Sequence, residues 1–319
     1  EMEVPKSALW GASTQRAVLN FPISGIPMSR SFIRALGYIK AGAAAANAEL
    51  GIINEEMKEV IISASLSVAD GNYDEHFPVD VFQTGSGTST NMNANEVIAS
   101  ISSEESGLKI HPNDHVNQGQ SSNDVIPSAL HLSALLEIEE NLCPALLTLQ
   151  NSLNQKSEEF MSIIKTGRTH LMDAMPIDFS QELSAWSAQL KNSRKTLFFM
   201  EARLLEMPLG GTAVGTGINA HPRFAKLFAK ELSNLSGAKY KFVASENFFH
   251  ELSAQDTAVQ VSGELKNLAI VLMKISNDLR WMNSGPLSGL SEIELQALQP
   301  GSSIMPGKVN PVIPEAVAM

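Results

Sequence analysis

Apolar residues recur at helical spacing along three long stretches of the chain. Between residues 258 and 282 the gaps between apolar positions are strictly three or four residues, which predicts the buried seam of a long helix. Ser253 and Asp256 have the spacing of a helix N-cap, and Gly285-Pro286 ends the pattern. The helix is therefore expected to span about 29 residues and about 44 Å. The seam consists of Val261, Leu265, Leu268, Leu272, Ile275, Leu279 and Met282.

Two further stretches predict helices of similar character. One runs from near Pro127 to Phe160, and the other runs from just after Pro176 to Leu204. A long helix with a narrow apolar stripe needs partners along its whole length. We therefore expect a mainly α fold, a long-helix bundle that other subunits complete. Strand-like alternation is scarce, and residues 239–243 are its best short candidate.

Four polar segments interrupt the helical pattern: residues 81–95, 115–123, 207–222 and 295–307. They are rich in Gly, Ser, Thr and Asn, which are poor residues for helix interiors. Polar surface loops would explain this composition. The same segments also concentrate hydroxyl, amide and backbone N–H donors, which are the groups that bind small anions without a permanent charge.

Composition narrows the classes of partner. The 319 residues contain 23 Lys and Arg against 34 Asp and Glu, a net charge of −11, so neither nucleic acid nor an anionic membrane is an expected partner. The longest strongly apolar run, residues 268–273, is too short to span a membrane. The single cysteine, Cys143, favours a reducing compartment, and we expect a cytoplasmic protein. A mitochondrial location would require a transit peptide before Glu1.

Residues 301–311 read GSSIMPGKVNP, a donor-rich loop that carries one cation, Lys308. The string resembles the signature of the fumarase/aspartase superfamily, in the form found in class II fumarases. Four more strings resemble class II fumarase motifs in the same order: TGSGTSTNMNANE (84–96), HPNDHVNQGQSSND (111–124), GRTHLMDAMP (167–176) and GGTAVGTGIN (210–219). The resemblance covers nearly the whole chain.

The resemblance implies a long-helix bundle of the fumarase/aspartase type with a smaller mixed N-terminal domain. We expect a mainly helical N-terminal domain at residues 1–120 and the central bundle at residues 121–319. Family members continue through further bundle helices and a small C-terminal domain, so the chain is expected to lack that end after Met319. They are also homotetramers whose active sites combine segments from three subunits.

The activity that the resemblance implies is the reversible hydration of fumarate to L-malate, without a cofactor or a metal. Ser302 is then the base, and Lys308 with the loop amides stabilises its alkoxide. His170 acts on the acid side through a water, with Glu315 holding the imidazole. The residues alone also allow His170 to be a hydrogen-bonded residue at a helix end, and Glu315 to be an acid in the first turn of a helix.

By the same resemblance, the substrate oxygens are bound by Ser86, Thr88, Ser121, Ser122, Asn123, Thr169, Lys308 and Asn310. An alternative role for Ser86 and Thr88 is to cap the helix that begins near Asn91 and Glu96.

A second anion site is implied at His111, Asn113 and Asp114. The chain departs from the family pattern there, because Leu108 replaces the usual Arg, with Lys109 as a substitute cation.

Two other functions fit the sequence. Aspartate ammonia-lyase uses the same carbanion chemistry and nearly the same 301–311 loop, but the His in GRTH and the string QSSND favour fumarase. A catalytically silent, truncated helical scaffold is the alternative outside enzymes.

Overall fold

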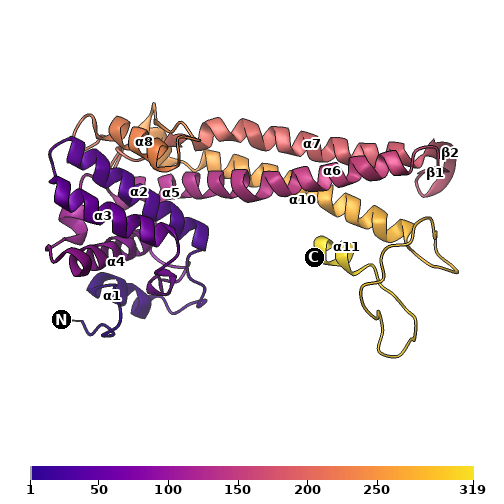
Figure 1. The fold of residues 1–319 in the computed structure, drawn as a ribbon, viewed down its shortest axis with the longest axis horizontal. Helices are drawn as coiled ribbons and strands as arrows, with labels where there is room; N and C mark the ends of the chain where they lie inside the picture. Colours follow the sequence, from indigo (N-terminus) through magenta and orange to yellow (C-terminus); the bar gives the residue numbers. More distant parts are fainter. Residues whose placement is uncertain (1) are drawn as a thin grey trace. The chain divides into compact units, whose positions relative to one another are not determined.

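A computed structural model describes residues 2–319 and confirms the mainly helical class (Figure 1). The long helices are α2 (Arg30–Glu49), α3 (Glu55–Ala69), α4 (Thr88–Ser106), α5 (Ser122–Glu137), α6 (Cys143–Glu159), α7 (Phe179–Leu204) and α10 (Asp256–Met282). Shorter helices are α1 (Ala12–Asn20), α8 (Phe224–Leu235), α9 (Phe248–Ser253) and α11 (Val312–Ala318). The strands are β1 (Ile164–Thr169), β2 (Met172–Asp178), β3 (Glu206–Met207) and β4 (Val243–Ala244).

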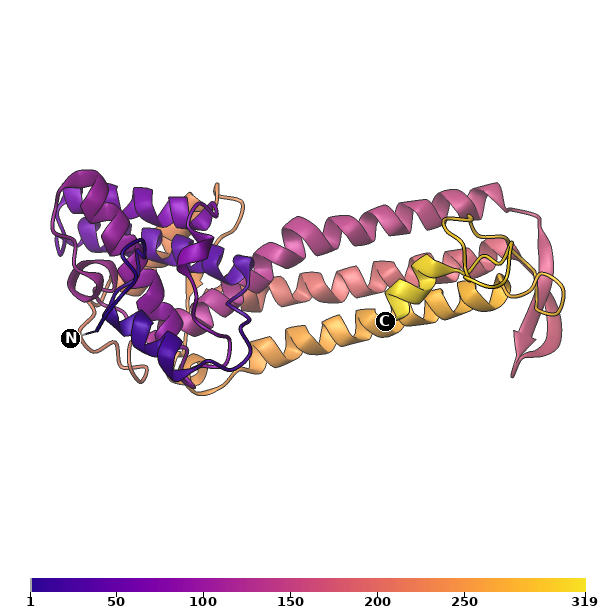
Figure 2. The same ribbon diagram turned by 90° about the horizontal axis from the view of Figure 1, so that it is seen from below.

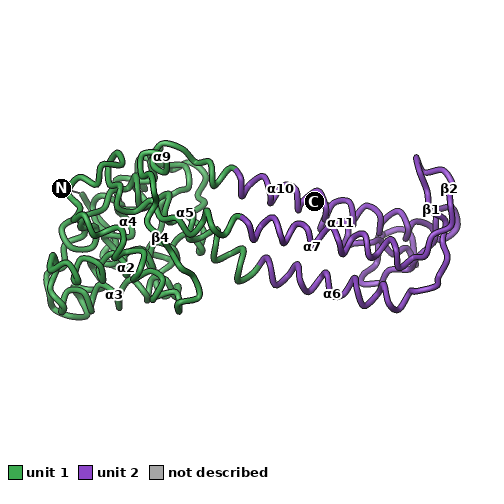
Figure 3. The backbone as a smooth tube through the Cα atoms, turned by 90° about the horizontal axis from the view of Figure 1, so that it is seen from above, with its two compact units in different colours: residues 1–141, 200–259 green, residues 142–199, 260–319 purple. Residues whose placement is uncertain are grey.

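The chain divides into two compact units (Figure 3). Unit 1 comprises residues 1–141 and 200–259, and unit 2 comprises residues 142–199 and 260–319. Each unit is therefore built from two separate stretches of sequence. The expected domains at residues 1–120 and 121–319 follow a different division, and they stay a prediction.

Unit 1 is a cluster of helices around α2, which packs against α3, α5 and α8. The small side chains of α2 allow its neighbours to approach closely. A Cβ atom at Gly37 would lie 2.5 Å from the backbone oxygen of Ser65 in α3, so only glycine fits at that crossing. The core beside it is aliphatic and aromatic, and includes Leu36, Ile39, Ile61, Ile98, Leu132, Phe224 and Phe228.

Unit 2 contains three long rods, α6, α7 and α10, which run side by side (Figures 1 and 2). Ser187 Oγ in α7 donates to Asn154 Oδ1 in α6, and the ring of Trp186 packs beneath Lys274 of α10. Apolar positions along the rods are buried at helical spacing: Leu146, Leu153, Leu183, Trp186, Leu190, Leu197, Leu268, Val271 and Ile275.

The three predicted helical stretches are confirmed, with two differences in detail. The stretch from Pro127 to Phe160 is interrupted by a π-helical segment at Ile138–Leu142, between α5 and α6. The predicted N-cap of the stretch at residues 258–282 is wrong. Ser253 is the last residue of α9, and its hydroxyl donates back to the carbonyl oxygens of Phe249 and His250, so it is not available at the start of α10.

Strands were harder to predict than helices. Of the candidate residues 239–243, only Val243 belongs to a strand, β4, which pairs in parallel with β3. The antiparallel hairpin of β1 and β2 was not predicted. Within residues 2–120 the strand-like pairing is limited to the isolated bridge between Pro27 and Asp80, so this N-terminal part is helical rather than mixed. Among residues 2–319, no helix combines the length and the apolar character needed to cross a membrane.

Candidate active site

The hydroxyls of Ser86 and Thr88 lie at the start of α4 in unit 1. Gly87, between them, has a φ of 68° and is the N-cap residue of the helix, which has no side-chain cap. Ser86 Oγ and Thr88 Oγ1 are 2.7 Å apart, and both residues lie on the exposed side of the turn. The alternative in which these two residues cap α4 is therefore wrong, and their hydroxyls form an exposed pair.

The predicted second anion site is a short turn that brings its three residues together. His111 Nδ1 accepts hydrogen bonds from the backbone N–H groups of Asn113 and Asp114, at 3.3 and 3.1 Å. Asp114 Oδ2 lies 3.2 Å from the same nitrogen, and all three side chains are exposed. The imidazole thus fixes the turn through Nδ1.

Ser121 is the N-cap residue of α5, in a capping box with Asp124. Asn123 N donates to Ser121 Oγ at 3.3 Å, and Ser121 N donates to Asp124 Oδ1 at 2.9 Å. The Ser121 hydroxyl therefore already has a structural role.

Asp124 was missed by the sequence analysis, although the capping-box spacing marks it. Its carboxylate is buried, and Oδ2 accepts from the backbone N–H groups of Gly210 and Thr212 at 3.0 and 2.8 Å. Burial raises the pKa of Asp124 to about 6, against the hydrogen bonds from Gly210, Ser121 and Thr212 and the charge of Lys40. Asp124 thereby ties the polar loop before α5 to the loop at residues 207–222.

Ser122 and Asn123 are held by polar contacts of their own. Asn91 Nδ2 in α4 donates to Ser122 Oγ at 3.0 Å, and Asn123 Nδ2 donates to the carbonyl oxygen of Ala213 at 2.8 Å. Lys40, which lies behind Asn91, was also missed, although a lysine within the apolar string YIKAGAAAAN is an unusual signal.

In unit 2, Thr169 and His170 lie at the tip of the hairpin formed by β1 and β2. His170 and Leu171 have φ values of 56° and 62°, the pair of positive values that a tight two-residue turn requires. Both Thr169 and His170 are exposed. The alternative in which His170 ends a helix is therefore wrong, because the chain is extended on both sides of it.

The loop at residues 301–310 closes on itself. Gly301 N donates to the Lys308 carbonyl oxygen at 2.7 Å, and Asn310 Nδ2 donates to the Gly301 carbonyl oxygen at 3.1 Å. Within the loop, Ser302 Oγ accepts from the backbone N–H groups of Ile304 and Met305, at 3.2 and 3.1 Å. Two donors aimed at one hydroxyl oxygen favour its ionised form.

Lys308, Asn310 and Glu315 line one cavity of about 740 Å³ beside the end of α10. Glu315 is half-buried and sits in the first turn of α11, as its alternative role requires. His170 lines a different cavity of unit 2, of about 840 Å³. Among the described residues of this single chain, Glu315 and His170 do not pair with each other.

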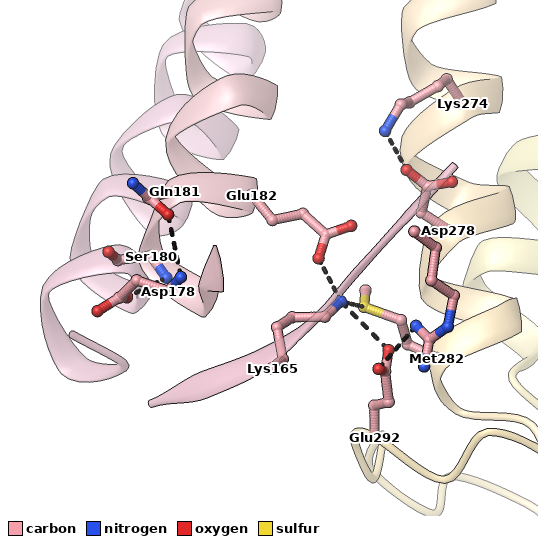
Figure 4. Close-up of polar contacts among 10 residues, drawn as sticks. Lys165, Asp178, Ser180, Gln181, Glu182, Lys274, Asp278, Met282 and Glu292 are labelled. Atoms are coloured by element: carbon pink, nitrogen blue, oxygen red, sulfur yellow. Dashed lines mark hydrogen bonds and ion pairs between the residues drawn. The ribbon is translucent and has the colours of Figure 1, made fainter. Parts of the chain in front are cut away.

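A network of charged residues anchors the His170 hairpin within unit 2 (Figure 4). Lys165 in β1 pairs with Glu182 in α7, and its Nζ lies 3.2 Å from Glu292 Oε2. Arg168 Nη1 lies 2.8 Å from Glu292 Oε1, and Glu292 N donates to the Met282 carbonyl oxygen at 2.8 Å. The hairpin is thus tied to α7 and to the segment that follows α10. The sequence analysis did not identify this network.

Comparisons with known proteins agree with one another. The family model described as lyase matches residues 1–319. The class II fumarate hydratase of Xylella fastidiosa is 57% identical over 319 residues, which are 100% of this chain and 67% of that protein. A second relative, "Fumarate hydratase class II 2" of Pseudomonas aeruginosa, is also 57% identical over 319 residues, 69% of its length. The crystal structure of recombinant class II fumarase from Schistosoma mansoni superposes with a TM-score of 0.96 at 40% identity, and covers 99% of this chain and 70% of that chain.

Proposed function

Because the chain belongs to the lyase family, and within it to the class II fumarate hydratases, which are hydro-lyases, we propose that it hydrates fumarate reversibly to L-malate through an aci-carboxylate intermediate. The observation that carries this proposal is the identity of 57% over 319 residues, a match that covers the whole chain. We infer the substrate, fumarate, from the names of these relatives.

In the dehydration direction, Ser302 removes a proton from the carbon beside a carboxylate of malate. The electron pair left on that carbon moves into the carboxylate, which becomes the aci-carboxylate. The proposal is supported by the two backbone N–H groups that donate to Ser302 Oγ, because the same donors stabilise an alkoxide. A free serine is a poor base, and the positive charge of Lys308 in the same loop stabilises its alkoxide.

His170 acts on the acid side, where it protonates the leaving hydroxyl through a water. The exposed position of His170 at the tip of the hairpin supports this role, because it leaves the imidazole accessible to substrate. Glu315 holds the imidazole and favours its charged form. Since the two residues do not pair within one chain, we propose that Glu315 meets the His170 of another subunit.

Substrate carboxylates are bound by the polar donor loops. The residues proposed for this role are Ser86, Thr88, Ser121, Ser122, Asn123, Thr169, Lys308 and Asn310. The exposed hydroxyl pair at the start of α4 supports the assignment of Ser86 and Thr88. The turn at His111, Asn113 and Asp114 is the second anion site.

We also propose a homotetramer in which subunits share active sites. The rods of unit 2 expose large apolar side chains, including Ile270 at 60% and Phe199 at 73%, and part of the predicted seam of α10 is only partly covered. Surfaces of this kind mark subunit interfaces. A monodisperse monomer in sedimentation velocity at working concentration would contradict this proposal. A cytoplasmic location stays a prediction.

The decisive assay follows the ultraviolet absorption of fumarate with and without ammonium. Loss of absorption in water alone supports hydration, whereas loss that requires ammonium would make the protein an aspartate ammonia-lyase. Ser302→Ala should nearly abolish turnover without changing the circular dichroism, and an active variant overturns the base assignment. His170→Asn should lower kcat more than substrate affinity.

A further inference from the structure

Lys40 in α2 is the feature of unit 1 that the proposed mechanism leaves unused. Its side chain is fully buried, with an exposed fraction of 0%. A buried lysine is normally paired with a carboxylate. Here Nζ donates instead to three side-chain amide oxygens: Asn91 Oδ1 at 2.8 Å, Asn117 Oδ1 at 3.0 Å and Gln120 Oε1 at 2.9 Å. The hydrogen bonds of Nζ thus go to neutral amides, and the effect of Lys40 on these amides is the starting point of the inference.

An ammonium group can only donate hydrogen bonds. Each of the three amides must therefore turn its oxygen towards Lys40 and its NH₂ group away. The outward NH₂ groups all find acceptors near the loop before α5. Asn117 Nδ2 donates to the Gln120 carbonyl oxygen at 3.2 Å, and Gln120 Nε2 donates to the Val116 carbonyl oxygen at 3.0 Å. The direction of every hydrogen bond in this network is set by the one cation at its centre.

The third amide connects the network to a proposed substrate-binding residue. Asn91 Nδ2 donates to Ser122 Oγ at 3.0 Å. A hydroxyl has one hydrogen, and because its oxygen accepts from Asn91, that hydrogen is not used in this contact. It remains available for donation to an anionic oxygen, which is what the binding of a carboxylate requires.

We propose that Lys40 is a positioning residue that orients the Asn91 amide, and that this orientation keeps the Ser122 hydroxyl hydrogen free to donate to a substrate carboxylate. The inference rests on the proposed function, in which Ser122 binds substrate. Lys40 touches neither substrate nor reacting atoms.

Polar groups around Lys40 partly offset the effect of burial on its ammonium group, and they also hold the loop before α5. Burial lowers the pKa of Lys40 to about 7, and the charge of Asp124 opposes that shift. The three amide oxygens add charge–dipole attraction that favours the ammonium. On its other side the loop is fixed by Asp124, which binds the N–H groups of Gly210 and Thr212. Ser122 is therefore held from two directions.

The test is the variant Asn91→Asp, assayed in the purified protein. The introduced carboxylate keeps acceptor oxygens for Lys40 but has no N–H group for Ser122, whose hydroxyl must then donate to that carboxylate instead of to substrate. We expect the KM for fumarate to rise about 10- to 100-fold, the loss typical of one hydrogen bond to a charged group, with a smaller change in kcat. Lys40→Met should raise the KM in the same way if it folds.

A double-mutant cycle separates this mechanism from a general effect of the new charge. If Asn91 acts through Ser122, then Ser122→Ala should raise the KM little further in the Asn91→Asp background. Asn93→Asp is the matched control, because Asn93 is also buried in α4 but donates to the His76 carbonyl oxygen; its KM should stay within about twofold of wild type.

Two results would overturn the inference: an Asn91→Asp variant with a KM like that of wild type, or effects of Asn91→Asp and Ser122→Ala that multiply. Either result with an active wild-type protein contradicts the inference alone. A wild-type protein that leaves fumarate unchanged contradicts the proposed function and the inference together.

Discussion

The closure of the 301–310 loop around Gly301 leads to a sharp prediction for Gly301→Ala. A Cβ atom at this position would lie 2.6 Å from Asn310 Oδ1 and 2.9 Å from both Cγ and the backbone N of the same residue. Non-bonded heavy atoms are most stable at about 3.5–4.0 Å. Rotation of the Asn310 side chain cannot relieve the contact with its backbone N, so the two sides of the loop must separate by about 1 Å.

The cost can be estimated from the hydrogen bonds that this separation weakens. They are the bond from Gly301 N to the Lys308 carbonyl oxygen and the bond from Asn310 Nδ2 to the Gly301 carbonyl oxygen. At about 1 kcal/mol net for each, the local cost is about 2 kcal/mol. The loop is only partly buried, so the helical core should survive. Activity should suffer more, because a misplacement of about 1 Å at the proposed base Ser302 costs about 100-fold in rate.

The assay combines kcat and KM for fumarate hydration with a thermal melt followed by circular dichroism. We expect a kcat about 100-fold below wild type and nearly unchanged helicity. Gly263→Ala in α10 is the control, because a Cβ atom there meets nothing within 4 Å. A Gly301→Ala protein that keeps half or more of the wild-type kcat would refute the argument that the close approach to Asn310 positions the loop.

Three further predictions concern stability. Gly263→Ala should stabilise the protein by about 1 kcal/mol, because alanine is the better helix residue and has room; a lowered Tm would contradict this. Leu36→Ala removes a fully buried side chain and should lower the free energy of unfolding, measured with denaturant, by about 2–5 kcal/mol. An unchanged free energy of unfolding would contradict this prediction. Although desolvation raises the pKa of Asp80, hydrogen bonds from backbone N–H groups such as those of Phe82 and Ser24 lower it to about 2. Because its pKa is lowered, Asp80 contributes stability above its unfolded pKa of about 3.9, and this contribution is lost as the pH falls towards 2. The difference in Tm between wild type and Asp80→Asn should therefore shrink over that range. A constant difference from pH 7 to pH 2 would exclude this linkage.

Local sequence was sufficient for the helices and for the identity of the polar loops. The three-and-four spacing that ends at Met282 predicted α10, since a helix repeats every 3.6 residues and burial selects one face. The loop strings, compared with the family that they resemble, selected the candidate residues. The hairpin that carries His170 was not predictable in this way, because its strands are mostly exposed and lack an alternating apolar pattern.

What the sequence determined by itself was therefore the helical class, the family and the chemical groups available for catalysis. Only the tertiary structure decided how those groups are supported. Lys40 is one lysine among many in the sequence, and it becomes a buried centre of three amides only because α2 meets α4 and the loop before α5, about 50 and 80 residues further along the chain. The direction of a hydrogen bond depends on which partners burial brings together, and burial by distant segments leaves no mark on local sequence.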